Sequence, residues 1–146
     1  SGAAFARRPV VTLLLIRHAS AGDRGDCEGE DRLRPLDGRG REQASRLAQL
    51  LENYEITRVL SSPAVRCVQT VEPLARTRGL EIEVREELGE EQQDEAGAEL
   101  VRSLVGDQAA VSVHGGLSDA VVGRSQKKGE VLVLDDGGNV AERVRS

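Results

Sequence analysis

Apolar and polar positions along this chain follow two alternating patterns, one typical of strands and one typical of helices. The run VVTLLLI at 10–16 is continuously apolar and rich in branched residues, which is typical of a strand buried on both faces. Shorter apolar stretches at 57–62, 80–85 and 109–113 predict three further strands. The last apolar stretch, EVLVLDDGGNVAERV, predicts a hairpin that turns at Asp135–Gly138.

Between these strands the apolar residues recur at helical spacing. In DGRGREQASRLAQLLEN, Asp37 is a residue type that caps helices, and Ala44, Leu47, Ala48 and Leu51 share one face. This segment therefore predicts an amphipathic helix that packs on the first strand's sheet.

A second helix is expected in SPAVRCVQTVEPLARTRG. Ser62 is a candidate N-cap with Pro63 in the first helical position, and Gly79 is a candidate stop. Pro73 lies inside the segment and is expected to kink or split the helix.

The alternation of strands and helices predicts the fold class. Two shorter helices are expected, one around 96–105 and one in LSDAVVG. The chain is therefore expected to be an α/β protein with a mainly parallel central sheet, helices on both faces and a C-terminal hairpin. We expect one domain over 10–146, with 1–9 as a linker or a cloning remnant.

Composition narrows the function classes. The 146 residues carry a net charge of −5 and almost no aromatic side chains, so neither nucleic acid nor an anionic membrane is expected as a partner. Arginine outnumbers lysine, and the planar guanidinium of arginine is better suited than an ammonium group to bind phosphate and carboxylate through two hydrogen bonds.

The two cysteines, Cys27 and Cys67, predict reduced thiols rather than a disulfide or zinc site. With no membrane-spanning run and no secretory signal visible, a cytoplasmic location is expected.

Four basic side chains point to a phosphate site. Arg17 and His18 follow the first strand, His114 follows the strand 109–113, and Arg66 lies in the first turn of the helix after Ser62. The carboxyl ends of parallel strands meet at one edge, so the two histidines, the only ones in the sequence, are expected to meet there. Two arginines and the N-terminal end of a helix would hold a phosphate, and a neutral imidazole is a competent nucleophile. The residues themselves leave open which histidine attacks.

Four segments carry a family resemblance: LLLIRHASAG, DRLRPLDGRGREQA, VLSSPAVRCVQTVEPLA and VSVHGG. In this order they resemble the histidine phosphatase superfamily, which has the phosphoglycerate mutase-like fold, over most of 10–134. The short length is most similar to small SixA-like phosphohistidine phosphatases. It is also similar to the phosphatase-like domain that follows a Nudix domain in some MutT-like proteins.

The resemblance implies roles for the four residues. His18 would be the phosphorylated nucleophile, while Arg17, Arg66 and His114 would complete the phosphate pocket; no metal and no cofactor would be needed. The family's general acid would come from REELGEEQQDE, where Glu90 matches best by position. Glu87 and Glu91 are the next candidates, and a solvated acidic loop is the ordinary interpretation of most of this segment.

Other residues near the predicted site have structural interpretations. Arg24, Arg32 and Arg34 follow the nucleophile, and a solvated loop charge is favoured for each. The acidic stretch GDCEGEDR does not match the spacing of a calcium loop. Gln43 matches the family, and we attribute it to packing of the first helix.

The sequence is compatible with three functions. The first is a metal-independent phosphatase that acts through His18 on a phosphorylated small molecule or a phosphohistidine protein. The alternative is the C-terminal domain of a MutT-like Nudix protein, which acts on nucleotide-type phosphates or only binds anions. A phosphoglycerate mutase is disfavoured because Ala19 stands where mutases usually have glycine, and because the long insertions of mutases are absent.

Overall fold

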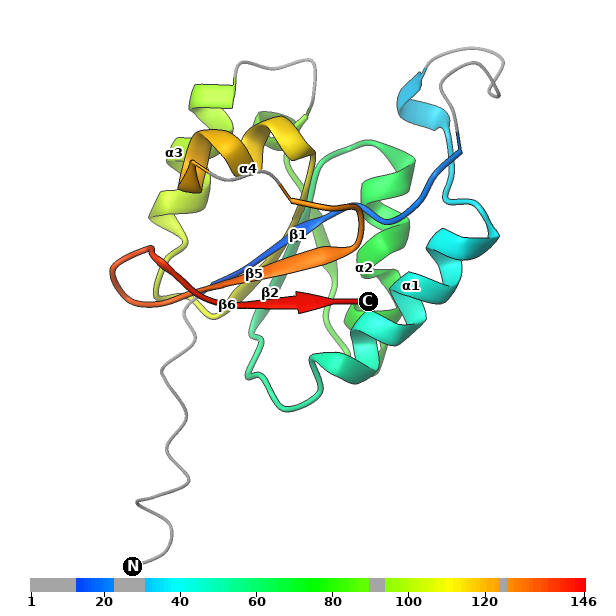
Figure 1. The fold of residues 1–146 in the computed structure, drawn as a ribbon, viewed down its shortest axis with the longest axis horizontal. Coiled ribbons are helices and arrows are strands. Elements are labelled where there is room, and N and C mark those ends of the chain that lie inside the picture. Colours follow the sequence, from blue (N-terminus) through cyan, green and yellow to red (C-terminus); the bar gives the residue numbers. More distant parts are fainter. Residues whose placement is uncertain (1–12, 23–30, 90–93, 124–125) are drawn as a thin grey trace, which may run out of the picture.

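The computed structural model describes residues 13–22, 31–89, 94–123 and 126–146, and within them one six-stranded sheet is flanked by helices (Figure 1). The strands are β1 (Leu13–Arg17), β2 (Arg58–Ser61), β3 (Ile82–Val84), β4 (Ala109–Val113), β5 (Glu130–Leu134) and β6 (Val140–Arg145). The helices are α1 (Gly38–Leu50), α2 (Val65–Arg78), α3 (Asp94–Ser103) and α4 (Gly115–Val122), with 3-10 turns at Asp31–Leu33 and Glu86–Leu88.

The strands lie in the order β3-β2-β4-β1-β5-β6. The first four in this order are parallel to one another, whereas β5 is antiparallel to β1, and β6 is antiparallel to β5. The predicted α/β class, with a mainly parallel sheet and a C-terminal hairpin, is confirmed.

Strand β1 is covered on both faces, as its apolar run predicted. Leu13 and Leu15 belong to the core cluster that includes α3 and α4, while Leu14 and Ile16 belong to the cluster that includes α1 and α2. Figure 1 shows the same division, with α3 and α4 on one side of the sheet and α1 and α2 on the other. Because side chains alternate along a strand, the next position on the α1–α2 side is 18.

Helix α1 begins where the sequence predicted, but helix α2 begins later than predicted. The Asp37 side chain accepts a hydrogen bond from the Gly40 amide and caps α1. Helix α2 begins at Val65 after an extended Ala64 that has no side-chain cap. The Ser62 hydroxyl accepts from the Ala64 amide at 3.3 Å, before the helix begins, and lies 2.9 Å from Nε2 of His114. The expectation of Ser62 as N-cap and Pro63 as first residue is therefore wrong.

The expected split at Pro73 is absent, since α2 runs without a break from Val65 to Arg78. One missing backbone donor does not end this helix, because its buried face, which includes Val71 and Leu74, stays packed in the core on both sides of the proline. Gly79 ends the helix in the left-handed conformation, as predicted.

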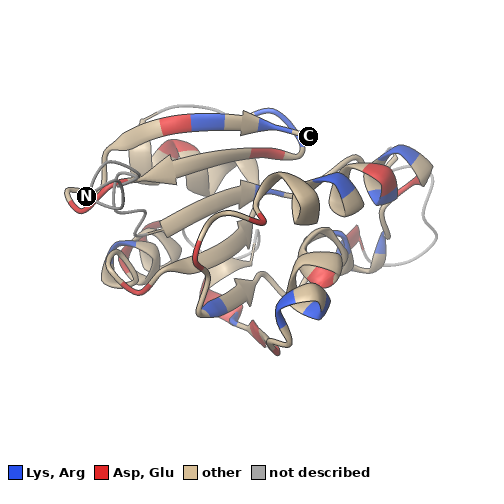
Figure 2. Cartoon of the chain, turned by 90° about the horizontal axis from the view of Figure 1, so that it is seen from below, with Lys and Arg blue, Asp and Glu red and all other residues tan. Residues whose placement is uncertain are grey.

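Charged residues lie mainly on the helices, on connecting loops and on β6 (Figure 2). Among the described residues, no helix combines the length and the apolar character that crossing a bilayer would require.

Candidate active site

The parallel pairing of β1 with β4 brings the two histidines together. Arg17 pairs with Val113 in the last register position, and the His18 amide donates to the Val113 carbonyl at 3.1 Å. His114 is the next residue after β4 and precedes α4. The two imidazole rings lie edge to face with centroids 5.7 Å apart.

His18 is buried and is held in one tautomer. Its Nδ1 lies 2.8 Å from the carbonyl oxygen of Ala19, and a carbonyl can only accept, so Nδ1 carries the proton. Nε2 therefore keeps its lone pair. Burial, which disfavours the charged ring, lowers the pKa of His18 to about 4; the Ala19 hydrogen bond opposes this shift, and the nearby Arg66, His114 and Arg17 add to it. The ring is neutral at pH 7.

Side chains of α1 and α2 accept hydrogen bonds from the backbone that follows His18. The Ala19 amide donates to the Thr70 hydroxyl at 2.9 Å, and that hydroxyl donates to the Arg66 carbonyl at 2.7 Å. The Ser20 amide donates to the side-chain oxygen of Gln43 at 2.9 Å. Gln43 thus fixes the loop that follows His18, a more specific role than the helix packing expected from the sequence.

Arg17 is positioned by residues far away in the sequence. Its Nη1 donates to the backbone carbonyl of Gln126, whose buried side-chain amide donates to the carbonyls of Leu15 and Glu130 at 2.8 and 2.9 Å. The Nε of Arg17 is buried and has no hydrogen-bond partner among the described residues, so it is a donor that an oxyanion can use. Gly115 packs against this guanidinium: a Cβ there would lie 3.1 Å from Arg17 Cζ.

Arg66 lies in the first turn of α2 and is only 2% exposed. It donates to the backbone carbonyl of Asp31 at 2.9 Å and forms an ion pair with the Asp31 carboxylate at 3.2 Å. The same carboxylate accepts from Arg34 Nε at 2.9 Å. Asp31, which sequence reasoning did not single out, fixes the plane of the Arg66 guanidinium.

The expectation of a solvated Arg34 is wrong. Arg34 is buried, and its guanidinium also donates to the carbonyls of Ala21 and Gly22 in the loop that follows His18. Arg32 is exposed, as expected, and Arg24 lies outside the described residues.

Two side chains lie around Nε2 of His114, one from the residue that follows β2 and one from α2. The Ser62 hydroxyl lies 2.9 Å away and the Cys67 sulfur 3.6 Å away. Cys67 is fully buried, in agreement with the predicted packing thiol, while its contact with His114 had no signal in the sequence. Cys27 lies outside the described residues.

One of the candidate general acids is unsuited to that role. Glu87 lies in a 3-10 turn and accepts a hydrogen bond from Arg85 at 2.9 Å, and this bond lowers the pKa of the Glu87 carboxyl. A carboxyl that is ionised at neutral pH has no proton to give. Glu90 and Glu91 lie outside the described residues, so the assignment of Glu90 stays a prediction.

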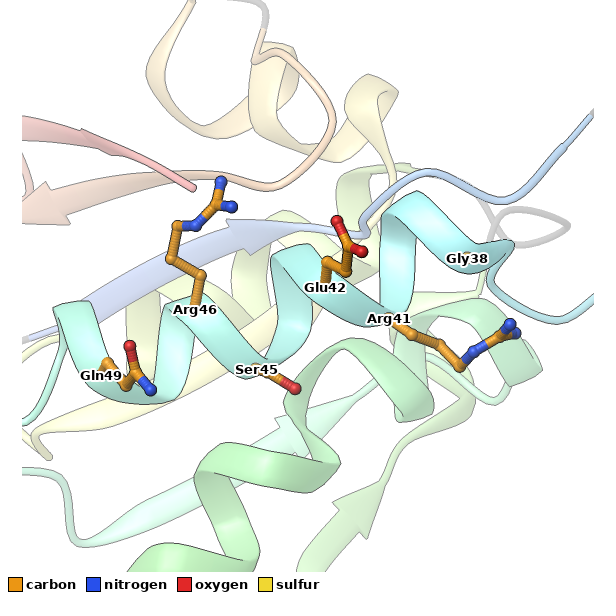
Figure 3. A pocket seen from close by; sticks show the side chains of 6 residues that line it. All are labelled: Gly38, Arg41, Glu42, Ser45, Arg46 and Gln49. Atoms are coloured by element: carbon orange, nitrogen blue, oxygen red, sulfur yellow. The ribbon is translucent and has the colours of Figure 1, made fainter.

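A surface hollow of about 600 Å³ on α1 lies apart from these side chains (Figure 3). It is lined by Gly38, Arg41, Glu42, Ser45, Arg46 and Gln49. This lining contains none of the four side chains Arg17, His18, Arg66 and His114. In the part of the chain that the structure describes, no group of three or more metal-binding side chains occurs.

Comparison with known proteins agrees with this geometry. The model of the histidine phosphatase superfamily (branch 1) matches residues 13–99, which include Arg17, His18 and Arg66. The chain is 47% identical over 74 residues to an 8-oxo-(d)GTP phosphatase of Mycolicibacterium smegmatis. That match covers 49% of this chain but only 23% of the relative, so most of the relative has no counterpart here.

Two solved structures share the fold. The protein histidine phosphatase SixA in complex with tungstate superposes with a TM-score of 0.72 and 24% identity, covering 91% of this chain and 96% of that one. The SixA-like protein of Agrobacterium tumefaciens gives a TM-score of 0.75 and 22% identity, over 92% and 97% of the two chains. Since the family model spans more than half of the sequence, the chain belongs to the histidine phosphatase superfamily (branch 1), and the prediction of a phosphatase is confirmed at the level of that family.

Proposed function

We propose that this chain is a metal-independent phosphatase that transfers a phosphoryl group to His18 and then to water. One observation carries the proposal. His18 is a neutral, buried imidazole whose Nδ1–H is bonded to the Ala19 carbonyl, and it lies beside His114 among the cations Arg17 and Arg66. Such a ring has its Nε2 lone pair free for attack.

In the first step the Nε2 lone pair of His18 forms a bond to phosphorus. The bond from phosphorus to the leaving group breaks, and its electron pair leaves with that group, which takes a proton from the proposed acid, Glu90. The phosphorylated ring becomes cationic, and the Ala19 carbonyl stabilises it by accepting from Nδ1–H. Arg17, Arg66 and His114 interact with the phosphoryl oxygens as charge shifts among them.

In the second step a water oxygen forms a bond to phosphorus. The P–Nε2 bond breaks, its electron pair returns to the ring, and the water proton passes to the carboxylate that protonated the leaving group. Phosphate then departs and His18 is again neutral. No step needs a metal ion or a cofactor.

The substrate class we propose is a nucleotide-type phosphate. The 47% identity to an 8-oxo-(d)GTP phosphatase supports this class, and the unmatched three-quarters of that relative is compatible with the alternative in which a Nudix domain precedes this one. A phosphohistidine protein is the second candidate. It is supported by the likeness to SixA, which extends over nearly the whole of both chains.

A phosphate-release screen tests the reaction and the substrate together. It should compare nucleoside mono-, di- and triphosphates, phosphohistidine peptides and sugar phosphates, with His18→Ala as the blank. We expect release by the wild type, none by His18→Ala, and no effect of a chelator. An alkaline quench during turnover should trap a phosphoryl group on His18 that peptide mapping locates. Turnover that persists in His18→Ala contradicts the mechanism.

The binding-module alternative makes a different prediction for the same samples. A chain that only binds anions would take up tungstate or vanadate in calorimetry but would release no phosphate from any substrate. Inhibition of turnover by the same oxyanions is the result we expect of an enzyme.

A further inference from the structure

Glu130, the first residue of β5, is a buried charged residue that the proposed mechanism does not use. It is only 1% exposed. Its Oε1 accepts from the guanidinium of Arg143 at 3.1 Å, and Nε of Arg145 lies 3.5 Å from its Oε2. Both arginines belong to β6, which pairs with β5 at the edge of the sheet (Figure 1). An apolar side chain often stabilises a fold as well as a buried ion pair does, so we looked for a role of Glu130 beyond packing.

Glu130 closes the turn that leads into β5, which we call the entry turn (126–129). Its Oε1 also accepts from the Lys127 amide at 3.1 Å, and its own amide donates to the Lys127 carbonyl at 3.0 Å. Its carbonyl accepts from the buried side-chain amide of Gln126 at 2.9 Å. The carboxylate, the amide and the carbonyl of one residue thus determine the shape of this turn.

The entry turn contacts the end of β1 and the residue that follows it. The Gly129 amide donates to the carbonyls of both Arg17 and His18 at 3.1 Å. The backbone carbonyl of Gln126 accepts from Nη1 of Arg17, while its side-chain amide donates to the carbonyl of Leu15 at 2.8 Å. With Nη1 bound in this way, the buried Nε of Arg17 is the donor left for an oxyanion among the described residues. The orientation of this guanidinium therefore depends on the shape of the entry turn.

We propose that Glu130 is a positioning residue of the phosphate site. Its carboxylate shapes the entry turn, and the turn holds the Arg17 guanidinium so that Nε donates to the bound oxyanion. Glu130 itself does not touch the substrate. The proposal rests on the proposed function in one respect, because Arg17 acts in turnover only if the chain is a phosphatase. The binding of an oxyanion can be measured without turnover.

Tungstate binding in calorimetry tests the proposal. In Glu130→Leu we expect the Kd for tungstate to rise about tenfold, because the displaced Arg17 loses a charge-assisted hydrogen bond to the anion. Glu130→Gln keeps an oxygen that can accept from the Lys127 amide and should restore most of the affinity. Glu130→Ser, which is too short to reach that amide and leaves room for water, is the second disruptive variant if Glu130→Leu does not fold.

Glu83→Leu is the matched control. Glu83 lies on β3, at the opposite edge of the sheet, and also pairs with an arginine, Arg58, at 2.8 Å. Its replacement removes one carboxylate and one ion pair without touching the entry turn. The Kd for tungstate should stay at the wild-type value. A rise as large as in Glu130→Leu would show that the loss of any ion pair weakens the site, which overturns the proposal.

A double-mutant cycle shows whether Glu130 acts through Arg17. Lysine at position 17 keeps the positive charge but has no planar guanidinium to orient. In the Arg17→Lys background the effect of Glu130→Leu on the Kd for tungstate should therefore shrink to less than about twofold. A general loss of structure would weaken binding by the same factor in both backgrounds, and that result also overturns the proposal.

Steady-state kinetics separates this proposal from the proposed function. With any substrate that is turned over, kcat/KM should fall about tenfold in Glu130→Leu and stay near the wild-type value in Glu130→Gln and Glu83→Leu. If no substrate is turned over, the phosphatase proposal fails, while the tungstate measurements still decide the role of Glu130. Unchanged tungstate affinity in Glu130→Leu refutes the positioning role even in an active phosphatase. A wild type that binds no tungstate contradicts both proposals.

Discussion

At the scale of single residues, His18 is prepared by burial and by a backbone carbonyl. A neutral acceptor fixes the tautomer without raising the basicity of the ring as strongly as a carboxylate would. The low pKa of His18, about 4, keeps Nε2, the proposed attacking nitrogen, unprotonated over the whole neutral range. The neighbouring Arg17 is constrained by packing as well as by hydrogen bonds, since its guanidinium occupies space that a side chain at Gly115 would fill.

Replacing Gly115 by alanine should therefore harm catalysis without harming stability. The added Cβ would lie 3.1 to 3.4 Å from three atoms of the Arg17 guanidinium and would displace it by a few tenths of an ångström. We expect kcat/KM to fall roughly tenfold. The melting temperature should stay level or rise, because alanine is the better helix former.

Gly38→Ala is the matched control, because Gly38 is also the first residue of a helix and its Cβ would have only one neighbour, at 3.9 Å. Equal activity of the two variants would show that Arg17 does not depend on this contact.

Thr70→Val tests whether the hydrogen bond from the Ala19 amide to α2 positions the loop that follows His18. Valine matches threonine in shape but leaves the buried Ala19 amide without an acceptor, which costs about 1–3 kcal/mol in the free energy of unfolding. Because Ala19 also carries the carbonyl that orients His18, kcat should drop as well. Urea unfolding and steady-state kinetics measure both effects.

Thr77→Val is the comparison on the same helix. Its hydroxyl also donates back to a carbonyl of α2, that of Leu74, and it lies away from the loop. A loss of activity in this variant as large as in Thr70→Val would rule out a specific role of the Ala19 bond.

At the scale of elements, local pattern predicted much of the fold. Strand β4 spans Ala109–Val113, the bounds that its apolar run predicted, and Asp37 caps α1 as its side chain predicted. The predicted start of α2 was wrong by two residues: the Ser62 hydroxyl accepts from the Ala64 amide before the helix begins, and it also lies against His114, a partner 52 residues away. The sequence pattern shows the local partner of this hydroxyl and not the distant one.

In the site, too, the sequence pattern predicted the residues with a local signal and missed those defined by distant contacts. Arg17, His18, Arg66 and His114 were singled out because each follows a strand or begins a helix. Their supports were not, since Asp31, Gln126 and Thr70 act through contacts that link segments tens of residues apart. These contacts depend on tertiary packing and leave no periodic signal in the sequence.

Helix α1 approaches the loop that follows His18 so closely that only glycine fits at position 40. A Cβ at Gly40 would lie 1.9 Å from the carbonyl oxygen of Ser20, which is a backbone atom and cannot rotate away. Gly40→Ala should push α1 off the loop and cost about 2 kcal/mol of stability. Chemical unfolding measures this cost, and Gly38→Ala is again the control. Wild-type stability of Gly40→Ala would contradict the observed approach.

At the scale of the whole molecule, the burial of His18 links stability to pH. The ordinary pKa of a histidine, 6.5, applies to the unfolded chain, whereas the folded value is about 4. Between these values the unfolded state binds more protons than the native state, so the contribution is complete above pH 6.5 and is lost as the pH falls towards 4. The loss from this one group amounts to about 3 kcal/mol.

The contribution of His18 to the pH dependence of unfolding can be isolated by comparing the wild type with a variant that lacks this imidazole. Asp37 and Glu87 have pKa values lowered by their hydrogen bonds, so their contributions are lost only below about pH 4.5. Urea unfolding from pH 7 to 4.5 should show a steady fall in stability for the wild type and a shallower one for His18→Asn, which cannot take up the proton. Parallel curves would mean that His18 is protonated in the folded protein near its ordinary pKa. The nucleophile would then carry a proton at mildly acidic pH, and turnover would fall over the same interval.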